Sequence, residues 1–540
     1  MTEADSSPTR ALFFDPHDQA IPLYTVAQLR ELEAHLAGQL PVHTLMARAG
    51  AAAARYLLET AAHDGLPLAG RRPVWLAAGP GNNGGDALVC ATALHKAGVA
   101  AEVCMPAEVK PDDAQWALAA ARAAGVPISH VPPASFKEYG WLVDGLFGIG
   151  LGRPLEGIFA ELAQRIAAQA HAAQCVLALD VPSGLDSDTG NVVGGGPAAC
   201  ASHTITFIGA KPGLYMTQGR DLAGAIALAP LGIHADHATA FAAGAASAIT
   251  LLNAPALFAA AFPPRVFATH KGTYGTLAVV GGDTGMCGAP ILAARAALYT
   301  GAGKVHVAFV GAGAPPYDPP YPELMLHSLD DTVDAFPLEA MDALALGCGM
   351  GKRAHAAEVL ARALALDVPK LIDADALNMI AGDAKLADAL AARGAAGATC
   401  VLTPHPLEAA RLIGCDTATV QRDRLAAART LAGRFGAVVV LKGAGTVVAA
   451  PDGRTAINPT GSAALATGGT GDVLGGIIGA LLAERLPGYE AALAGVHLHG
   501  LAADTLTASG AGPAGLTAGE LAPAVRACLN RLIYPARGQR

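Results

Sequence analysis

The chain has 540 residues, which is too long for one ordinary hydrophobic core and predicts roughly two to four domains. Hydrophobic residues make up 52% and charged residues 15%, which excludes a disordered protein, and 64 glycines are typical of many tight strand-to-helix turns. The formal net charge of −9, without any run rich in Lys and Arg, argues against nucleic acid or an anionic membrane as the main partner.

The N-terminal residues MTEADSSPTRALFF carry acids where a secretory signal would carry basic residues, so we expect no export. The Ala-rich stretch 240–262 is interrupted by Asn253 and Pro255, short of the ~20 apolar residues that a membrane span needs. No two of the nine cysteines stand in a metal-like spacing. We therefore expect a cytoplasmic protein whose cysteines are reduced and buried.

The first part of the chain alternates helices with short apolar strands. Thr25 is placed to cap a helix over 26–40, in which leucines recur at helical spacing. The apolar runs predict strands at 74–78, 101–105, 141–147, 175–181 and 203–208. Such alternation predicts a parallel sheet that is covered by helices on both faces.

Three polar, glycine-containing loops end strands of this pattern: GPGNNGGD (79–86), DGLFGIGLGRP (144–154) and DVPSGLDSDTG (180–190). Ligands of open parallel sheets bind beyond the carboxyl ends of the strands. We therefore expect one sheet edge to collect Asn82, Asn83, Asp86, Asp144, Asp180 and Ser183. Their oxygens could hold a hard monovalent cation, and the glycine loops could hold a phosphate. Alternatively, GPGNNGGD is only a tight turn, and Asp144 and Asp180 only cap a helix and a turn.

NNGGD, DGLFGIGLGRP and LDVPSGLDSDTG, in this order, resemble the NAD(P)H-hydrate epimerase family over roughly residues 20–235. The resemblance implies a Rossmann-like three-layer sandwich that interconverts the R and S forms of NADHX and NADPHX. It implies one potassium ion held by Asn83, Asp144 and Ser183. It also implies a hydrate site walled by Asn82, Asn83, Gly84, Gly85, Asp86, Gly148, Ile149, Gly150, Leu151, Gly152, Arg153 and Pro154.

Asp180 faces the substrate in this resemblance and is our candidate acid/base. Epimerisation at the hydrated carbon needs C–O cleavage and re-addition of water on the other face. Ala87 and Ile149 stand where the family commonly has Gly and Thr.

A second α/β pattern follows, with strands predicted at 275–282, 304–310, 343–347, 370–374, 399–404, 437–443 and 446–451. The Ala-rich stretch 233–262 between the two patterns lacks their strand rhythm. We place the joint near 235–250 and predict one domain over 1–240 and another over 241–540.

The stretch ATGGTGDVLGG (466–476) precedes an apolar run and suggests a phosphoryl-transfer loop. No GxxxxGK[ST] motif is present, so a P-loop is unavailable. The N–H groups of 468–471 and the helix dipole can bind a phosphoryl group instead. Asp472 can then take a proton from the attacking hydroxyl. The alternative is a glycine-rich helix start that Asp472 merely caps.

Further loops could serve this site, although none is decisive alone. LKGAGT (441–446) follows a strand and offers Lys442, and TPHPLE (403–408) places His405 between two prolines. Either could instead be structural. The other candidates are HKGTYG (270–275), GMCGAPILAARAALYTGAG (285–303), GCGMG (347–351) and DADALN (373–378).

HKGTYGTLAVVGG, PYPELM, DADALN, LTPHPLEAARLIG, KGAGT and NPTGSAALATGGTGDVLGG together resemble the ADP- or ATP-dependent NAD(P)H-hydrate dehydratase family over roughly 250–535. The resemblance implies a ribokinase-like three-layer α/β domain. It implies S-hydrate contacts from Ala289, Gly349, His405 and Asp472. It implies adenine-nucleotide contacts from Lys442, Gly443, Ala444, Gly445, Thr446 and Gly471.

The implied reaction phosphorylates the hydrate hydroxyl, after which phosphate leaves and the nicotinamide ring is restored, with magnesium bridging the nucleotide phosphates. GCGMG and SAAL (462–465) depart from the family's usual Gly-Pro-Gly and Asn-Pro-Gly-Leu. Bacterial members with two fused domains generally use ADP, which favours ADP over ATP here.

The two resemblances together indicate a bifunctional NAD(P)H-hydrate repair enzyme that is a homo-oligomer, as both families often are. Two alternatives stay open. One is a ribokinase-like small-molecule kinase that keeps its phosphorylated product, and the other is a nucleotide-binding scaffold whose first half is inactive.

Overall fold

The computed structural model describes residues 12–13, 20–63, 68, 71–172, 175–232 and 249–535. The chain forms two compact units. Unit 1 comprises Met1–Asp15 and Pro22–Thr250, and unit 2 comprises Pro16–Ile21 and Leu251–Arg540. The predicted boundary between 240 and 241 lies outside the described residues.

Unit 1 contains an eight-stranded sheet with the order β1-β9-β8-β7-β6-β3-β4-β5. The strands are β1 (Leu12–Phe13), β3 (Val74–Ala78), β4 (Ala101–Cys104), β5 (Ile128–Ser129), β6 (Trp141–Gly145), β7 (Cys175–Leu179), β8 (His203–Phe207) and β9 (Ala225–Ala229), while the short β2 (Pro22–Leu23) precedes the first helix. The helices are α1 (Val26–Ala37), α2 (Thr44–His63), α3 (Asn82–Lys96), α4 (Asp112–Ala123), α5 (Gly157–His171) and α6 (Gly219–Leu222), with 3-10 turns at Val193–Gly195 and Pro212–Leu214.

The sheet of unit 1 is parallel from β9 to β5, and β1 pairs antiparallel with β9. Neighbouring residues of one strand pack on opposite faces, as strand geometry requires. In β6, Val143 packs in the core with residues of α2, α3 and α4, whereas Leu142 packs in the core with residues of α5. Helices therefore cover both faces, and the predicted three-layer α/β fold is confirmed for this unit.

Unit 2 is built on a sheet that runs β13-β12-β11-β14-β15-β16-β17-β18-β19-β10. The strands are β10 (Thr250–Leu252), β11 (Thr276–Gly281), β12 (Lys304–Phe309), β13 (Met325–Ser328), β14 (Ala343–Leu346), β15 (Lys370–Ile372), β16 (Cys400–Leu402), β17 (Val438–Leu441), β18 (Val447–Ala449) and β19 (Thr455–Ile457). The sheet is parallel from β13 to β17, and the hairpins β17–β18 and β18–β19 are antiparallel.

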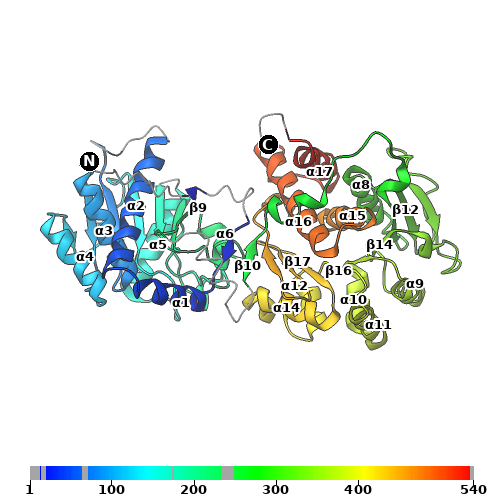
Figure 1. The fold of residues 1–540 in the computed structure, drawn as a ribbon, viewed down its shortest axis with the longest axis horizontal. Coiled ribbons are helices and arrows are strands. Elements are labelled where there is room, and N and C mark those ends of the chain that lie inside the picture. Colours follow the sequence, from blue (N-terminus) through cyan, green and yellow to red (C-terminus); the bar gives the residue numbers. More distant parts are fainter. Residues whose placement is uncertain are drawn as a thin grey trace. The chain divides into compact units, whose positions relative to one another are not determined.

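Helices cover both faces of this sheet (Figure 1). The helices are α8 (Gly288–Thr300), α9 (Ala354–Ala365), α10 (Ala374–Gly382), α11 (Ala384–Ala395), α12 (Pro406–Ile413), α13 (Thr417–Arg422), α14 (Arg424–Phe435), α15 (Thr470–Ala483), α16 (Gly488–Ala508) and α17 (Ala518–Ile533). Short 3-10 turns occur at Pro255–Leu257, Ala259–Ala261, Lys271–Tyr274, Leu338–Ala340 and Ala463–Leu465. Figure 1 shows α8, α15, α16 and α17 on one face, and α9, α10, α11, α12 and α14 on the other.

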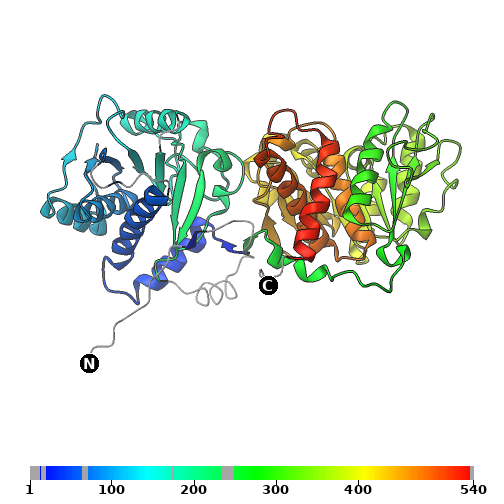
Figure 2. The same cartoon turned by 90° about the horizontal axis from the view of Figure 1, so that it is seen from above.

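The apolar run after Asp472 forms α15, which is buried on all sides from Val473 to Ala483. A helix that is hydrophobic all round belongs inside a large core. Gly476 permits the closest contact, because a Cβ there would lie 1.9 Å from the carbonyl oxygen of Ala293 on α8. Figure 2 shows unit 2 from above, with α15 drawn in orange. This burial fixes the start of α15 against the sheet.

All nine cysteines are free thiols, and six of them are buried. None of the helices in the described part of the chain has the length and apolar character that a membrane crossing requires.

Two candidate active sites

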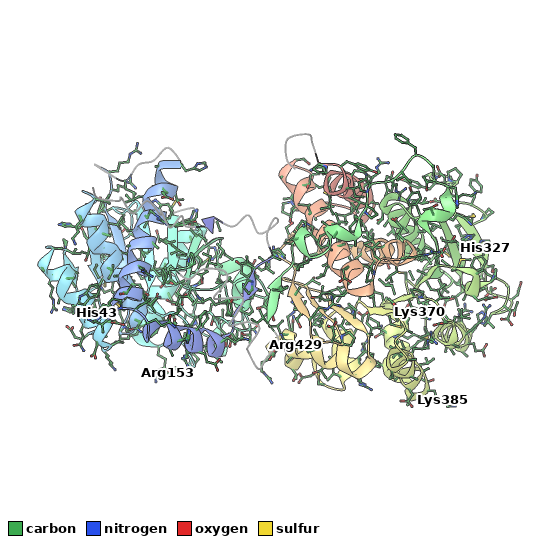
Figure 3. All side chains as sticks on the ribbon, viewed as in Figure 1. His43, Arg153, His327, Lys370, Lys385 and Arg429 are labelled. Atoms are coloured by element: carbon green, nitrogen blue, oxygen red, sulfur yellow. The ribbon has the colours of Figure 1, made fainter. Side chains whose placement is uncertain are left out.

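The first candidate site lies where β3, β6 and β7 end. These strands are neighbours in the sheet, so their following loops meet, as predicted. A cavity of about 780 Å³ opens there. Its lining includes the predicted residues Asn82, Asn83, Asp86, Gly148, Ile149, Gly150, Leu151, Gly152, Arg153 and Asp180. Arg153 is exposed and can be found at the lower edge of this unit in Figure 3.

Part of the predicted glycine loop is helical instead. Helix α3 begins at Asn82, so NNGGD forms its first turns. A Cβ on Gly84 would lie 1.9 Å from the carbonyl oxygen of Gly79, and one on Gly85 would lie 2.5 Å from Cε of Met46. Both glycines therefore allow close packing. They and Pro154 lie outside the cavity lining.

Asp144 and Ser183 are buried and hydrogen-bonded to each other, and Asn83 is buried beside the loop after β6, where a Cβ on Gly148 would lie 3.5 Å from Asn83 Cγ. The hydroxyl of Ser183 donates to Asp144 Oδ1 over 2.6 Å, and the backbone N–H of Ser183 donates to Oδ2 over 2.8 Å. Asn83 uses its Nδ2 to donate to the carbonyl oxygen of Leu179, while its buried Oδ1 has no hydrogen-bond partner among the described residues. Burial raises the pKa of Asp144, which these hydrogen bonds partly oppose.

This donor set fits a hard monovalent cation. A buried Oδ1 without a partner is costly, and a bound cation would satisfy it together with the charge of Asp144. No group of three or more His, Cys, Asp or Glu side chains suited to a metal occurs within the described ranges. A site made of one carboxylate, one hydroxyl and one amide oxygen therefore suits potassium better than a transition metal.

Asp180 lies at the end of β7 with a left-handed backbone, φ +68°. Its Oδ1 accepts hydrogen bonds from Lys211 Nζ and, over 3.3 Å, from the N–H of Phe207. Its Oδ2 lies 3.4 Å from the N–H of Ile149 on the predicted wall. Only 9% of Asp180 is exposed, and this exposed part faces the cavity.

Further carboxylates face the same cavity. Burial raises the pKa of Asp86 well above its usual value, and the negative charges of Asp180, Glu33 and Asp113 add to this rise. Burial and the charge of Asp180 also raise the pKa of Glu33, which sits on α1. The floor of the cavity is thus acidic, whereas Arg153 stands at its exposed rim.

The second candidate site lies at the start of α15. Gly469 precedes this helix with φ +90°, a conformation that favours glycine, and Gly468 is exposed. Asp472 falls in the first turn, where the N–H groups of the helix are unpaired. The structure thus brings a glycine-containing turn, a helix start and a carboxylate together at this point.

Burial raises the pKa of Asp472 above its usual value. A hydrogen bond with the Cys348 thiol opposes this rise, and the charge of Asp373 adds to it. Cys348 belongs to the GCGMG loop, and it is fully buried. The carboxylate is therefore a stronger proton acceptor than an exposed aspartate.

Lys442 lies beside this helix start. Its Nζ donates to Asp373 Oδ1 over 2.7 Å and lies 3.7 Å from the position that a Cβ on Gly471 would occupy. Burial lowers the pKa of Lys442, but the carboxylates of Asp373 and Glu408 outweigh burial, so the net shift is upward. The predicted nucleotide contacts Lys442 and Gly471 are thus neighbours, and both stand next to Asp472.

The KGAGT segment is the turn of the β17–β18 hairpin, and Arg424 on α14 supports it from below. The buried guanidinium of Arg424 donates to the carbonyl oxygens of Leu441 and Ala444, each over 3.0 Å. Gly443 leaves room for this contact, because a Cβ there would lie 2.6 Å from the guanidinium. These hydrogen bonds hold the hairpin turn against α14.

His405 caps α12. Its Nδ1 accepts hydrogen bonds from the N–H groups of Leu407 and Glu408, and Glu408 Oε2 accepts from the N–H of His405. Burial raises the pKa of Glu408 to about 7. Nδ1 of His405 therefore has a structural role as the cap of α12. The other ring nitrogen, Nε2, lies 3.3 Å from Glu408 Oε1.

Gly349 and Ala289 are also neighbours. Gly349 has φ +56°, and a Cβ on it would lie 3.4 Å from Cβ of Ala289 and 2.8 Å from the carbonyl oxygen of Met286. The predicted hydrate contacts therefore come from the loop after β14, from α8, from α12 and from α15.

The residues missing from the sequence-based set of site residues include Lys211, Asp373, Glu408 and Arg424, in addition to Glu33, Asp113 and Cys348. DADALN and TPHPLE are candidate loops in the sequence, but the pattern does not single out Asp373 or Glu408 within them. A strand followed by a capping Asp was the available signal for Asp373, which is the N-cap of α10. Lys211 and Arg424 gave no signal, because their partners lie 31 and 17 to 20 residues away in the chain.

Family models match both units. The model of the YjeF-related protein N-terminus matches residues 42–213, and the model of NAD(P)H-hydrate dehydratase matches residues 277–524. A bifunctional NAD(P)H-hydrate repair enzyme of Coxiella burnetii is 38% identical over 514 residues, which is 94% of this chain and 99% of that protein.

Two further proteins are similar to the second unit. The ADP-dependent (S)-NAD(P)H-hydrate dehydratase of Neisseria meningitidis is 47% identical over 292 residues, 52% of this chain and 94% of that protein. The crystal structure of a Bacillus subtilis ADP/ATP-dependent NAD(P)H-hydrate dehydratase, co-crystallised with ATP and Mg²⁺, is 32% identical with a TM-score of 0.43, covering 51% of this chain and 96% of that one.

Proposed function

The chain belongs to the bifunctional NAD(P)H-hydrate repair enzymes, and from this premise we propose which unit and which residues carry each reaction. Unit 1, which contains the match to the YjeF-related N-terminus, epimerises R- and S-NAD(P)HX. Unit 2, which contains the dehydratase match, converts S-NAD(P)HX to NAD(P)H. The observation that carries this division is that each candidate site lies within one unit: Asp180 faces the cavity of unit 1, and Asp472 stands at the start of α15 in unit 2.

In unit 1, Asp180 Oδ2 is the acid/base of epimerisation. The lone pair of the ring nitrogen expels the hydroxyl, which takes a proton and leaves as water. Water then adds to the other face of the iminium carbon and gives a proton to a carboxylate. The net change is inversion alone, so the site needs no external reductant or oxidant. Gly148, Ile149 and Gly150 wall the hydrate on one side, and Asp86 on another.

Potassium would be held by Asn83 Oδ1, Asp144 and Ser183, as their oxygens fit this ion. When bound, it supplies fixed positive charge beneath the hydrate site. Asp144 and Ser183 then hold the loop after β6 against the loop after β7 through their 2.6 Å hydrogen bond. This cluster keeps Asp180 and the 148–154 wall at a constant separation.

In unit 2, the hydroxyl oxygen of the hydrate attacks the terminal phosphorus of the nucleotide, and Asp472 takes the proton of this hydroxyl. If ADP is the donor, AMP is the leaving group. Phosphate then leaves the hydrated carbon and the neighbouring carbon loses a proton, which restores the dihydronicotinamide. Gly349, Ala289 and His405 contact the hydrate, while Gly471 and the 442–446 turn contact the nucleotide. Lys442 balances the phosphate charge.

Magnesium would arrive with the nucleotide phosphates, since the described residues contain no carboxylate cage for it. The relative from Neisseria meningitidis is named ADP-dependent, which supports ADP as the donor. The nine free cysteines support a reducing compartment, and we place the enzyme in the cytoplasm. Self-association stays a prediction, which sedimentation of the full chain can test.

Phosphate release tests the dehydratase assignment. With S-NADHX, magnesium and ADP, we expect one inorganic phosphate for each NADH that appears at 340 nm. A ribokinase-like kinase would instead accumulate a phosphorylated product without recovery of the 340 nm absorbance. Repeating the assay with ATP decides between the two donors, because the preferred nucleotide gives the higher kcat/KM.

A further inference from the structure

Unit 1 buries a lysine directly behind the proposed acid/base. Lys211 follows β8 and is only 1% exposed, so its ammonium has almost no contact with water. A buried charge of this kind is costly unless it is paired and hydrogen-bonded. The partner is Asp180, whose Oδ1 accepts a hydrogen bond from Lys211 Nζ.

All three N–H groups of Lys211 are directed into the protein. Besides Asp180, Nζ donates to the hydroxyl of Thr206 over 2.8 Å and to the carbonyl oxygen of Phe207 over 2.9 Å. An ammonium group has three donors, so none remains for a ligand in the cavity. Lys211 therefore cannot bind the substrate directly. Its ion pair is with Asp180, and its positive charge also opposes the rise in the pKa of Glu33 and of Asp86.

These contacts set the direction of the Asp180 carboxylate. Oδ1 is held by Lys211 and by the N–H of Phe207, whereas Oδ2, which lies 3.4 Å from the N–H of Ile149, is the oxygen on the cavity side. Oδ2 lies 3.2 Å from the position of a Cβ on Gly148, in the loop that walls the cavity. The left-handed backbone of Asp180 is unfavourable for a residue other than glycine, so surrounding contacts must hold it in place.

The surrounding charges make this contact important. Asp86, Glu33 and Asp113 face the same cavity, and the negative charges of Asp86 and Glu33 oppose one on Asp180. The arginines of the lining, Arg30 and Arg153, are exposed, whereas Lys211 is buried. Lys211 thus supplies positive charge on the buried side of the carboxylate.

We propose that Lys211 is a positioning residue for the epimerase reaction, which balances the charge of Asp180 and turns its Oδ2 toward the hydrate. This role rests on the proposed function of Asp180 as the acid/base. It predicts that replacing Lys211 lowers kcat, the rate at which the bound hydrate is epimerised. KM should change much less, because Lys211 does not touch the substrate.

The test is a double-mutant cycle on the full-length protein, with Lys211→Met, Asp180→Asn and the double variant. Each protein is given pure R-NADHX in potassium buffer, and formation of the S epimer is followed by chromatography, with the rate in the absence of enzyme subtracted. We expect Lys211→Met to lower kcat about 100-fold, with KM within about threefold of wild type. The double variant should be no slower than Asp180→Asn alone, because the two residues act as one unit.

Two further variants separate positioning from folding. Lys211→Gln keeps an N–H for Asp180 without the charge, and we expect an intermediate loss of about tenfold. Thr206→Val removes another hydrogen bond of the same ammonium, and its kcat should stay within about threefold of wild type. Thermal unfolding of every variant shows whether unit 1 is folded. If Lys211→Met is unfolded, the kcat of Lys211→Gln is used for the test instead.

The inference is overturned if a folded Lys211 variant keeps wild-type kcat, or if the losses of Lys211→Met and Asp180→Asn multiply in the double variant. An Asp180→Asn protein with wild-type epimerase activity would instead overturn the proposed role of Asp180. The two failures are therefore distinguishable.

Discussion

At the scale of single residues, the protein places each proposed proton acceptor in a different electrostatic setting. Asp180 is paired with a buried ammonium group, whereas Asp472 is hydrogen-bonded to a buried thiol and has the carboxylate of Asp373 nearby. Neither setting follows from the loop sequences alone. GGTGD identified the helix-start carboxylate correctly, but the thiol came from a loop more than a hundred positions earlier in the chain.

The Cys348 thiol beside Asp472 leads to a prediction for the pH dependence of the dehydratase reaction. Asp472 must be deprotonated to act, so the dehydratase kcat/KM should fall as pH drops through its raised pKa, above the usual aspartate value of about 3.9. The Cys348 hydrogen bond lowers this pKa, so Cys348→Ala should move the acid limb to higher pH. Cys415→Ala is the control with an unmoved limb. An unchanged profile in Cys348→Ala would show that the thiol does not tune Asp472.

Potassium gives a second residue-scale prediction. Replacing potassium by sodium at equal ionic strength should lower the melting temperature of wild type and its epimerase activity, because the proposed site at Asn83 Oδ1 and Asp144 would lose its cation. Asp144→Asn should remove the difference between the two salts, which calorimetry in each buffer measures. The dehydratase activity of the same protein is the internal control, and it should be equal in the two salts. Equal melting curves for wild type in both salts would contradict a potassium site.

Glu408 gives a stability prediction. Its pKa of about 7 in the folded protein lies above the usual glutamate value, so folded Glu408 holds a proton that the unfolded chain has released between these values. Stability from this group is present below the unfolded pKa and is lost as pH rises through about 7. Glu408→Gln should flatten the fall of the melting temperature between pH 5 and 8. A parallel fall in both proteins would count against this pKa.

At the scale of secondary structure, the turn that follows β17 is shaped by a residue from a neighbouring helix. Arg424→Met removes the donors to the carbonyl oxygens of Leu441, Lys442 and Ala444, and we expect the nucleotide KM of the dehydratase to rise about 10- to 100-fold. Arg434→Met, on the same helix, loses a hydrogen bond to Leu412 and should leave this KM unchanged. If both variants raise KM equally, general destabilisation of α14 is the cause.

Close helix packing makes a further prediction at this scale. Gly476→Ala should destabilise unit 2 by about 1–3 kcal/mol, because its Cβ would overlap the backbone of α8. Gly433→Ala, in α14, meets no atom within 4 Å and should instead stabilise the helix by roughly 0.5–1 kcal/mol. Urea unfolding of both variants measures the two signs. Equal stability changes would contradict the tight α8–α15 contact.

The sequence predicted the central strands better than the edges. Apolar runs such as 74–78 coincide with β3, but short edge strands such as β5 and β13 carry too few apolar residues for a periodic signal. The 446–451 run was predicted as a strand, yet its antiparallel pairing in β18 depends on the hairpin. NNGGD was expected as a loop and is helical, because two of its glycines pack against Gly79 and Met46. Tertiary contacts therefore decided what local propensity left open.

At the scale of the whole molecule, two units with separate cores hold two sites of complementary chemistry. A dehydratase that accepts only S-hydrate strands the R epimer, and an epimerase on the same chain returns that fraction to the usable form. Joining the units ensures that both activities are present in equal amount. This account requires that each carboxylate serves its own unit only.

The most direct test is absorbance at 340 nm on a mixed pool of R- and S-NADHX with ADP, magnesium and potassium. Wild type should restore the whole pool, Asp180→Asn should stop or slow sharply after the S fraction, and Asp472→Asn should restore about 10³-fold more slowly or not at all. Adding Asp180→Asn and Asp472→Asn proteins together should restore the whole pool again. Failure of wild type to restore any absorbance, with either nucleotide, would contradict the account.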